Sequence, residues 1–228
     1  MVRIKWMLSF SVALNILLLA LIIILNHRYD QGGFIRKAYD CQRGWTNSLE
    51  SLHDTVDIVF LGNSITHGGA FDEAFADKHI CNLGYPSDNL KGMSGRVDQI
   101  KALHPQKIFV MGGFNGLTTI DLQVFSSEYE DLVKNIGSEM PAARIYLQSI
   151  LPVNRSINNY KLPTVEKIIG ANQIIKSISK KYNCVYIDLY SLYQKDDILP
   201  TPYTDDGVHL KADAYTIWYN AINDFIYE

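Results

Sequence analysis

The chain has 228 residues, of which 47% are hydrophobic, and a formal net charge of −3. This length and composition suit one globular domain with an appended segment, and the slightly acidic balance provides no basic surface for nucleic acid. Three cysteines, Cys41, Cys81 and Cys184, are too few and too scattered for a disulfide framework or a zinc motif. A disulfide bond between Cys41 and Cys81 remains an alternative if the domain lies outside the cytoplasm.

The first predicted element is an apolar span from Met7 to Leu25, about 19 residues long, which is enough to cross a membrane as a helix. Arg3 and Lys5 precede the span, so the positive-inside rule places the N-terminus in the cytoplasm and the rest of the chain outside. A cleaved signal peptide is the alternative, but no small-x-small cleavage site follows the span. We predict a cytoplasmic tip and an uncleaved transmembrane anchor over residues 1–27, with the remaining chain extracytoplasmic.

A polar linker is predicted over residues 28–46, and a single domain over residues 47–228. In this domain, runs of β-branched and aromatic residues alternate with segments of helical periodicity. The predicted strands are Asp57–Leu61, His79–Leu83, Lys107–Met111, Arg144–Ser149 and Cys184–Asp188. The predicted helices are Asn47–His53, Ala70–Ala76, Asp88–Leu103, Asp121–Met140, Thr164–Tyr182 and Lys211–Ile226.

Alternation of strands and helices is typical of parallel strands joined by crossover helices. The segment Asp121–Met140 supports this pattern, because its apolar residues recur every three to four positions and mark one buried face. We predict an α/β fold, namely a flavodoxin-like three-layer α/β/α sandwich with a five-stranded parallel sheet. One N-terminal transmembrane helix is expected to precede it.

Four polar or glycine motifs follow strands of this predicted sheet. Ser64 comes after the first strand, Gly84 after the second and Asn115 after the third, while Asp206 and His209 lie in the loop after the fifth. In open α/β sheets, ligands bind beyond the carboxyl ends of the strands. The sequence therefore predicts that these residues meet at one edge of the sheet.

At these positions the chain resembles the SGNH/GDSL hydrolases, the GDSL-like lipase/acylhydrolase family. Gly-Asn-Ser-Ile at residues 62–65 is a variant of the Gly-Asp-Ser-Leu motif, and the resemblance runs from about Asp57 to the C-terminus. Two residues depart from the family pattern: Asn63 replaces an Asp before the serine, and Gly116 replaces an Asp after the asparagine, where it could loosen the turn. The family's signature Ser, Gly, Asn and His correspond in order to Ser64, Gly84, Asn115 and His209.

A serine hydroxyl is a weak nucleophile that needs a neighbouring base, and histidine has the right basicity near neutral pH. We predict Ser64 as nucleophile, His209 as base and Asp206, three residues before it, as the group that orients the imidazole. Asp205 is the second choice as orienting residue. The structural alternatives are a helix N-cap for Ser64 and an ordinary surface histidine for His209.

Attack on an ester produces an oxyanion that needs hydrogen-bond donors. The expected donors are the backbone N–H groups of Ser64 and Gly84 and the side-chain amide of Asn115. The alternatives are a simple turn glycine at 84 and a turn-forming Asn-Gly pair at 115–116, which is compatible with a donor role. Three aromatic residues next to the motifs could line the substrate pocket or belong to the core, and these are Tyr85, Phe114 and Tyr203.

The resulting prediction is a serine esterase of the SGNH type that is anchored in a membrane. The resemblance implies short acyl groups such as acetyl, carried by a small molecule or a glycan, and no cofactor. No residue cluster has metal-ligand spacing. Two alternatives stay open: an acyltransferase with the same residues, and a carbohydrate-binding domain with weakened chemistry, for which Gly116 is the only support. His67 receives no role, and Asn154-Arg155-Ser156 matches a glycosylation acceptor.

Overall fold

The computed structural model describes residues 18, 20–21, 55–157 and 161–228. The chain divides into two compact units, residues 1–44 and 45–228, and the α/β domain is the second of them. Almost all of the predicted anchor, the predicted linker, the helix predicted at Asn47–His53 and Cys41 lie outside the described residues. Within the described part of the chain, no helix is both long and apolar enough to span a membrane.

Five parallel strands form one sheet in the order β2-β1-β3-β4-β5. This is the strand order of flavodoxin-like folds, in which the chain reverses direction across the sheet between β1 and β3. The predicted α/β fold with a five-stranded parallel sheet is therefore confirmed. The strands are β1 (Ile58–Gly62), β2 (Ile80–Gly84), β3 (Lys107–Met111), β4 (Arg144–Gln148) and β5 (Val185–Ile187).

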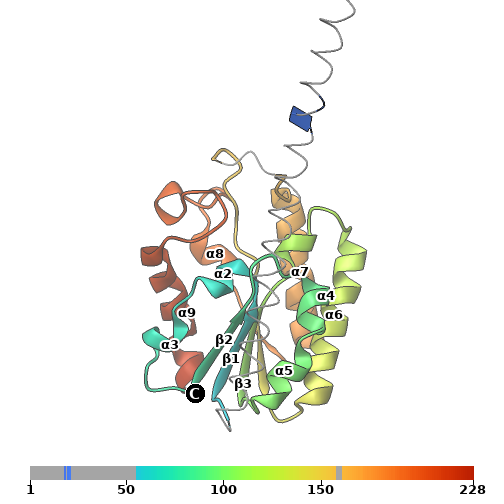
Figure 1. Ribbon diagram of the computed structural model, residues 1–228, viewed down its shortest axis with the longest axis vertical. Helices are drawn as coiled ribbons and strands as arrows, with labels where there is room; N and C mark the ends of the chain where they lie inside the picture. The colour runs from blue at the N-terminus through green and yellow to red at the C-terminus, as the bar shows by residue number, and fades with distance from the viewer. Residues whose placement is uncertain (1–17, 19, 22–54, 158–160) are drawn as a thin grey trace, which may run out of the picture. The chain divides into compact units, whose positions relative to one another are not determined.

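Helices cover both faces of the sheet (Figure 1). One face carries α4 (Leu90–Ser94), α5 (Val97–Ala102), α6 (Leu122–Glu139) and α7 (Val165–Lys181), and the other carries α3 (Phe71–Ala74) and α9 (Tyr215–Tyr227). Shorter pieces lie in the connections, namely α2 (Ser64–His67), α8 (Tyr190–Tyr193) and the 3₁₀ turns η1 (Phe114–Gly116), η2 (Thr201–Tyr203) and η3 (Ala212–Ala214).

The long helix α6 has the amphipathic pattern that the sequence predicts. Asp121 caps its N-terminus by accepting a hydrogen bond from the backbone N–H of Val124. The buried positions are spaced three and four apart, so they form one stripe along the helix. They are Phe125, Tyr129, Leu132, Val133 and Ile136.

An aromatic stack fixes α9 to the sheet. Phe109 lies between Phe60 and Tyr146 in the strand register, with ring centroids 4.9 and 4.3 Å away. Trp218 of α9 is fully buried, and its indole N–H donates to the side chain of Gln148 at 2.6 Å. Because α9 follows the loop that carries His209, this contact helps to hold that loop over the carboxyl edge of the sheet.

Two predicted helices differ from the structure. The segment Asp88–Leu103 forms two short helices, α4 and α5, which break at Gly95 and Arg96. Arg96 turns its side chain into the interior, which a continuous exposed helix would not allow. The last predicted helix begins as the turn η3 and becomes α-helical only at Tyr215.

Candidate active site

Ser64 is the first residue of α2, immediately beyond the carboxyl end of β1. The N-cap of this helix is Asn63, whose buried side-chain oxygen accepts a hydrogen bond from the Ile65 N–H at 3.0 Å. The N-cap interpretation of Ser64 is thus wrong, because its neighbour fills that place. Asn63 stands where the family pattern has Asp, and this difference has a physical reason. The neutral amide of Asn caps the helix without burying a negative charge.

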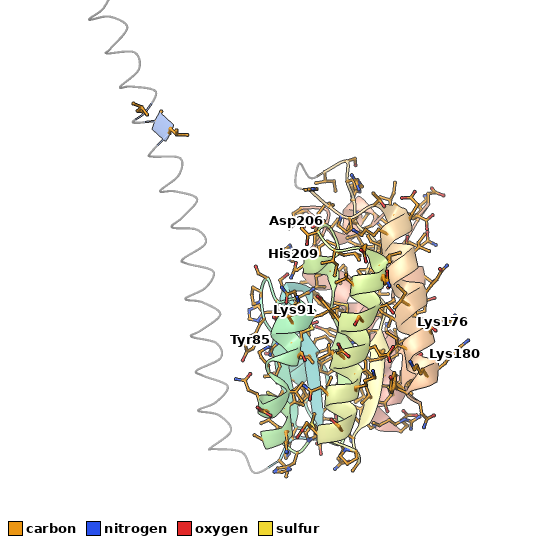
Figure 2. All side chains as sticks on the ribbon, turned by 90° about the vertical axis from the view of Figure 1, so that its right-hand side faces the viewer. Tyr85, Lys91, Lys176, Lys180, Asp206 and His209 are labelled. Atoms are coloured by element: carbon orange, nitrogen blue, oxygen red, sulfur yellow. The ribbon has the colours of Figure 1, made fainter. Side chains whose placement is uncertain are left out.

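Ser64, His209 and Asp206 form a continuous chain of hydrogen bonds. The Ser64 hydroxyl lies 2.9 Å from Nε2 of His209, and Nδ1 of the same ring lies 2.6 Å from a carboxylate oxygen of Asp206. With the proton on Nδ1, the ring donates to Asp206 and presents the Nε2 lone pair to the serine. Figure 2 shows Asp206 and His209 together at the upper end of the domain.

Asp206 is held in place mainly by its own loop. Its other carboxylate oxygen accepts from the backbone N–H groups of His209 at 2.8 Å and Val208 at 2.9 Å. Partial burial opposes ionisation, but the hydrogen bonds from the His209 ring and from these two N–H groups lower the pKa of Asp206 to about 2. Asp205, the second choice as orienting residue, forms an ion pair with Lys211 at 2.6 Å instead, and its side chain is 83% exposed.

The loop before His209 depends on a glycine and on a contact with the loop after β4. Gly207 has a φ of 83°, in the left-handed region that glycine tolerates best. Its N–H donates to the Thr204 hydroxyl, and its carbonyl accepts from the Asn154 N–H at 2.8 Å. These contacts let the short Asp-x-x-His segment place the Asp206 carboxylate against the His209 ring and that ring against Ser64.

Asn115 lies in η1, directly beyond the carboxyl end of β3. Gly113 makes the preceding turn with a φ of 98°. The Asn115 amide nitrogen donates one hydrogen bond to the backbone carbonyl of Asp88, at 2.7 Å, and its second hydrogen remains for a ligand. The Gly116 carbonyl accepts hydrogen bonds from the N–H groups of Thr119 and Ile120. The turn interpretation of Asn115 is therefore compatible with a donor role for its amide.

Gly84 differs from its predicted geometry. Its N–H donates to the side chain of Asn82 at 2.9 Å, so the group expected to bind an oxyanion is engaged within its own strand. The structure gives Gly84 a second reason to lack a side chain: an added Cβ would meet the backbone of Thr66 and His67 in α2. The Ser64 N–H, by contrast, begins a helix and has no acceptor within it.

The unassigned residues near the motifs have separate roles. The His67 ring donates through Nδ1 to the Gly84 carbonyl at 3.1 Å. Tyr85 is fully buried and belongs to the core, whereas Phe114 is partly exposed. Tyr203 lines a hollow of about 600 Å³ beside the His209 loop, together with Asn154, Ile198 and Pro200.

Sequence reasoning missed two groups. The sequence pattern marks Asn154 only as part of a glycosylation acceptor. In the structure Asn154 is buried, and its amide donates a hydrogen bond to the Leu199 carbonyl at 2.9 Å. Its role is structural, because its backbone N–H also binds the Gly207 carbonyl in the neighbouring loop. Asp88 and Arg96 form a buried ion pair at 2.6 Å next to Asn115. Sequence gives no signal for this pair, because both residue types are usually exposed.

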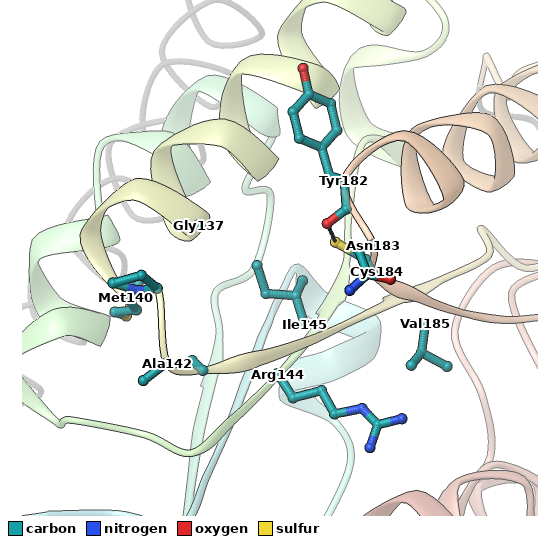
Figure 3. A pocket seen from close by; sticks show the side chains of 11 residues that line it. Gly137, Met140, Ala142, Arg144, Ile145, Tyr182, Asn183, Cys184 and Val185 are labelled. Carbon is teal, nitrogen blue, oxygen red and sulfur yellow. Dashed lines mark hydrogen bonds between the residues drawn. The ribbon is translucent and has the colours of Figure 1, made fainter.

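A hollow of about 590 Å³ lies at the opposite, amino-terminal edge of the sheet and contains none of the predicted site residues (Figure 3). Its rim includes Arg144, Tyr182 and Cys184. Burial raises the pKa of the Cys184 thiol to about 11, so the thiol stays protonated and unreactive near neutral pH.

In the described residues, no group of three His, Cys, Asp or Glu side chains could hold a metal ion.

A doubly wound parallel sheet with a hydrogen-bonded Ser-His-Asp arrangement at its carboxyl edge is typical of serine-dependent hydrolases. The model of the GDSL-like lipase/acylhydrolase family matches residues 60–217, and the chain belongs to this family. It is accordingly a carboxylic ester hydrolase. The match includes the segments that contain Ser64, Gly84, Asn115 and His209.

Individual relatives agree with this assignment. A GDSL esterase/lipase of Arabidopsis thaliana is 27% identical over 190 residues, which cover 70% of this chain and 74% of the relative. A solved structure described as a putative platelet activating factor from Streptococcus pneumoniae has a TM-score of 0.77 at 23% identity, covering 86% of this chain and 95% of its own. A GDSL-like lipase from Bacteroides thetaiotaomicron has a TM-score of 0.70 at 19% identity, covering 81% and 96%. These two structures share the fold.

Proposed function

We propose that Ser64, His209 and Asp206 are the catalytic triad of a serine esterase for short acyl groups. The observation that carries this proposal is the chain of hydrogen bonds from Ser64 through His209 to Asp206, at 2.9 and 2.6 Å. A base that touches the nucleophile and is itself oriented by a third group is the arrangement that activates a serine hydroxyl.

The reaction proceeds in two halves. Ser64 Oγ attacks the ester carbonyl carbon while its proton moves to His209 Nε2, and this proton then passes to the departing alcohol oxygen. Water next attacks the acyl-serine, His209 accepts a proton from that water, and the proton returns to Ser64 Oγ as the carboxylic acid leaves. Asp206 stays ionised throughout and stabilises the imidazolium.

The oxyanion would be bound by the Ser64 N–H and by the second hydrogen of the Asn115 amide. Asn115 is already held by one hydrogen bond, so its amide is oriented before the substrate arrives. Gly84 is the predicted third donor, and in this role its N–H would leave Asn82 for the oxyanion.

The acyl group is proposed to be short, such as acetyl, and the alcohol part to be a carbohydrate. The side chains of His209 and Asp206 are 50% and 45% exposed, so the site is accessible from solvent. This accessibility supports a substrate with a bulky alcohol part. Water is the proposed acceptor of the acyl group. Transfer to a second hydroxyl would use the same residues and would appear as a different product.

We further propose that residues 1–27 anchor the enzyme in a membrane and that the catalytic domain is extracytoplasmic. The support is the apolar stretch from Met7 to Leu25 behind Arg3 and Lys5.

Turnover of chromogenic esters tests the activity. The purified full chain in detergent should hydrolyse 4-nitrophenyl acetate with a higher kcat/KM than the butyrate and octanoate esters, and Ser64→Ala should lose this activity. A fluorophosphonate probe should label the wild type and not Ser64→Ala. Activity that persists in Ser64→Ala would refute the nucleophile, and preference for octanoate would refute the short acyl group. Acetylation of an added sugar, in place of acetate release, would indicate transfer.

A further inference from the structure

Arg96 is a charged residue in the interior of the domain. It follows Gly95 at the break between α4 and α5, and none of its surface is exposed. Its guanidinium binds one carboxylate oxygen of Asp88 through Nε at 3.0 Å and through a terminal nitrogen at 2.6 Å. The Asp88 side chain is itself only 3% exposed. Such burial is rare for either residue type and calls for an explanation.

The same guanidinium connects the carboxyl ends of two strands. A terminal nitrogen donates to the Leu83 carbonyl in β2 at 3.1 Å and lies 3.5 Å from the Gly62 carbonyl, the last residue of β1. The charged group also lies over the ring of Tyr85, 3.7 Å from its centroid. Arg96 therefore contacts the strand end that precedes Ser64 and the start of the loop that follows β2.

Asp88 links this cluster to the candidate oxyanion hole. Its carboxylate is held by Arg96, while its backbone carbonyl accepts the hydrogen bond from the Asn115 amide at 2.7 Å. The turn around Asp88 is closed by two further bonds, from the Asp88 N–H to the Tyr85 carbonyl and from the Asn89 N–H to the Asp88 side chain. The position of the Asp88 carbonyl, and with it the angle of the Asn115 amide, thus depends on the ion pair.

Stability alone is a poor reason for this pair. Burial raises the pKa of the Asp88 carboxyl above its usual value even though the adjacent Arg96 charge lowers it. The desolvation cost of a buried ion pair commonly equals or exceeds its Coulombic gain, so an apolar pair of similar volume would often serve stability as well. A fixed hydrogen-bond donor, in contrast, requires rigid support for the group that aims it.

We propose that Arg96 and Asp88 are positioning residues for the oxyanion hole. Their ion pair fixes the turn at residues 85–89, and the Asp88 carbonyl in that turn holds the Asn115 amide in the orientation that receives the oxyanion. This inference rests on the proposed function, in which Asn115 is an oxyanion donor. Neither residue contacts the reacting atoms.

The test is a double-mutant cycle between Arg96→Lys and Asn115→Ala, measured on 4-nitrophenyl acetate with the full chain. Lysine keeps the charge but cannot form the two-nitrogen contact with Asp88. We expect Arg96→Lys to lower kcat about tenfold with little change in KM when Asn115 is present. In the Asn115→Ala background the same substitution should change kcat less than about twofold, because the group it positions is gone. The shape of the pH–rate profile should not change.

Asp88→Asn provides a second, nearly isosteric variant in case Arg96→Lys does not fold, as judged by circular dichroism and thermal melting. It should show the same dependence on Asn115. Equal losses of kcat in both backgrounds, or wild-type kcat in a folded variant, would overturn the positioning role, and so would failure of both variants to fold. Absence of turnover by the wild type would instead refute the proposed function, which separates the two failures.

Discussion

Asp206 binds His209 at two points, with one carboxylate oxygen on the ring nitrogen Nδ1 at 2.6 Å and the other on the backbone N–H at 2.8 Å. A single carboxylate thus fixes both the main chain and the imidazole of the residue that contacts Ser64. This double attachment restricts rotation of the ring and keeps Nε2 directed at the Ser64 hydroxyl. It also separates the roles of two adjacent carboxylates, since Asp205 binds Lys211 instead.

The first prediction concerns these two carboxylates. Asp206→Asn should lower kcat/KM by several orders of magnitude, up to about 10⁴-fold, because an amide cannot hold the imidazole in the productive tautomer. Asp205→Asn is the matched control and should stay within about threefold of the wild type, as expected for an exposed ion pair. Steady-state kinetics on 4-nitrophenyl acetate would measure both. A larger loss of kcat/KM in Asp205→Asn than in Asp206→Asn would reassign the orienting role to Asp205.

The second prediction concerns acid stability. The pKa of Asp206 is about 2 in the folded protein, below its value of about 3.9 in an unfolded chain. Ionised Asp206 therefore stabilises the folded state above about pH 4, and this contribution is lost as the pH falls toward 2. Urea unfolding at a series of pH values should show Asp206→Asn less stable than the wild type at pH 6, with the difference shrinking between about pH 4 and pH 2. A difference that grows on acidification would contradict the assignment.

The third prediction tests the oxyanion donor. Asn115→Ala should lower kcat by about 10²–10³-fold and leave KM nearly unchanged, because the lost hydrogen bond forms in the transition state. Thermal melting serves as the control for folding. If the variant instead loses stability and keeps full activity per folded molecule, Asn115 acts only in the turn.

The fourth prediction concerns the close packing of Gly84 against α2. Gly84→Ala should destabilise the protein by about 1–3 kcal/mol, because its Cβ would press on the backbone of Thr66 and His67 rather than on a movable side chain. Denaturant titration would measure this loss. Gly116→Ala is the matched control, since an added Cβ there meets only the tip of Ile120 at 3.7 Å. Equal stability of the two variants would argue against the close approach of α2 and β2.

The fifth prediction concerns location. If residues 1–27 are an uncleaved anchor, the intact chain should pellet with membranes, resist carbonate extraction and retain Met1. Protease added from the outer face should then digest the catalytic domain, because Arg3 and Lys5 keep the N-terminus inside. Recovery of a soluble chain that begins near His27 would indicate a cleaved signal peptide.

Much of the fold could be predicted because it is encoded locally. The strand boundaries agree with the prediction to within one residue, and the predicted strand Lys107–Met111 agrees at both ends. The reason is that short runs of β-branched and aromatic residues between turn residues are typical of buried strands. The convergence of Ser64 and His209 also followed from sequence, because parallel strands bring their carboxyl ends to one edge.

Other features depended on side-chain rotamers and on contacts between separate loops. The N–H of Gly84 is engaged by Asn82, a contact set by side-chain rotamers that no motif records. The turn that aims Asp206 at His209 requires the positive φ of Gly207 and the contact with Asn154, which belongs to another loop. A linear pattern does not contain these distances, so the sequence could rank Asp206 above Asp205 but could not show where either points.

The sequence by itself determined the order of the elements, the family and the residues that meet at the sheet edge. Only the tertiary structure decided that Arg96 lies inside, where it breaks the helix predicted over residues 88–103. An arginine in a helical pattern is ordinarily solvated, and burying its charge requires a carboxylate and free carbonyl groups at the same point in space. Asp88 and the ends of β1 and β2 supply these groups together only after the sheet has formed.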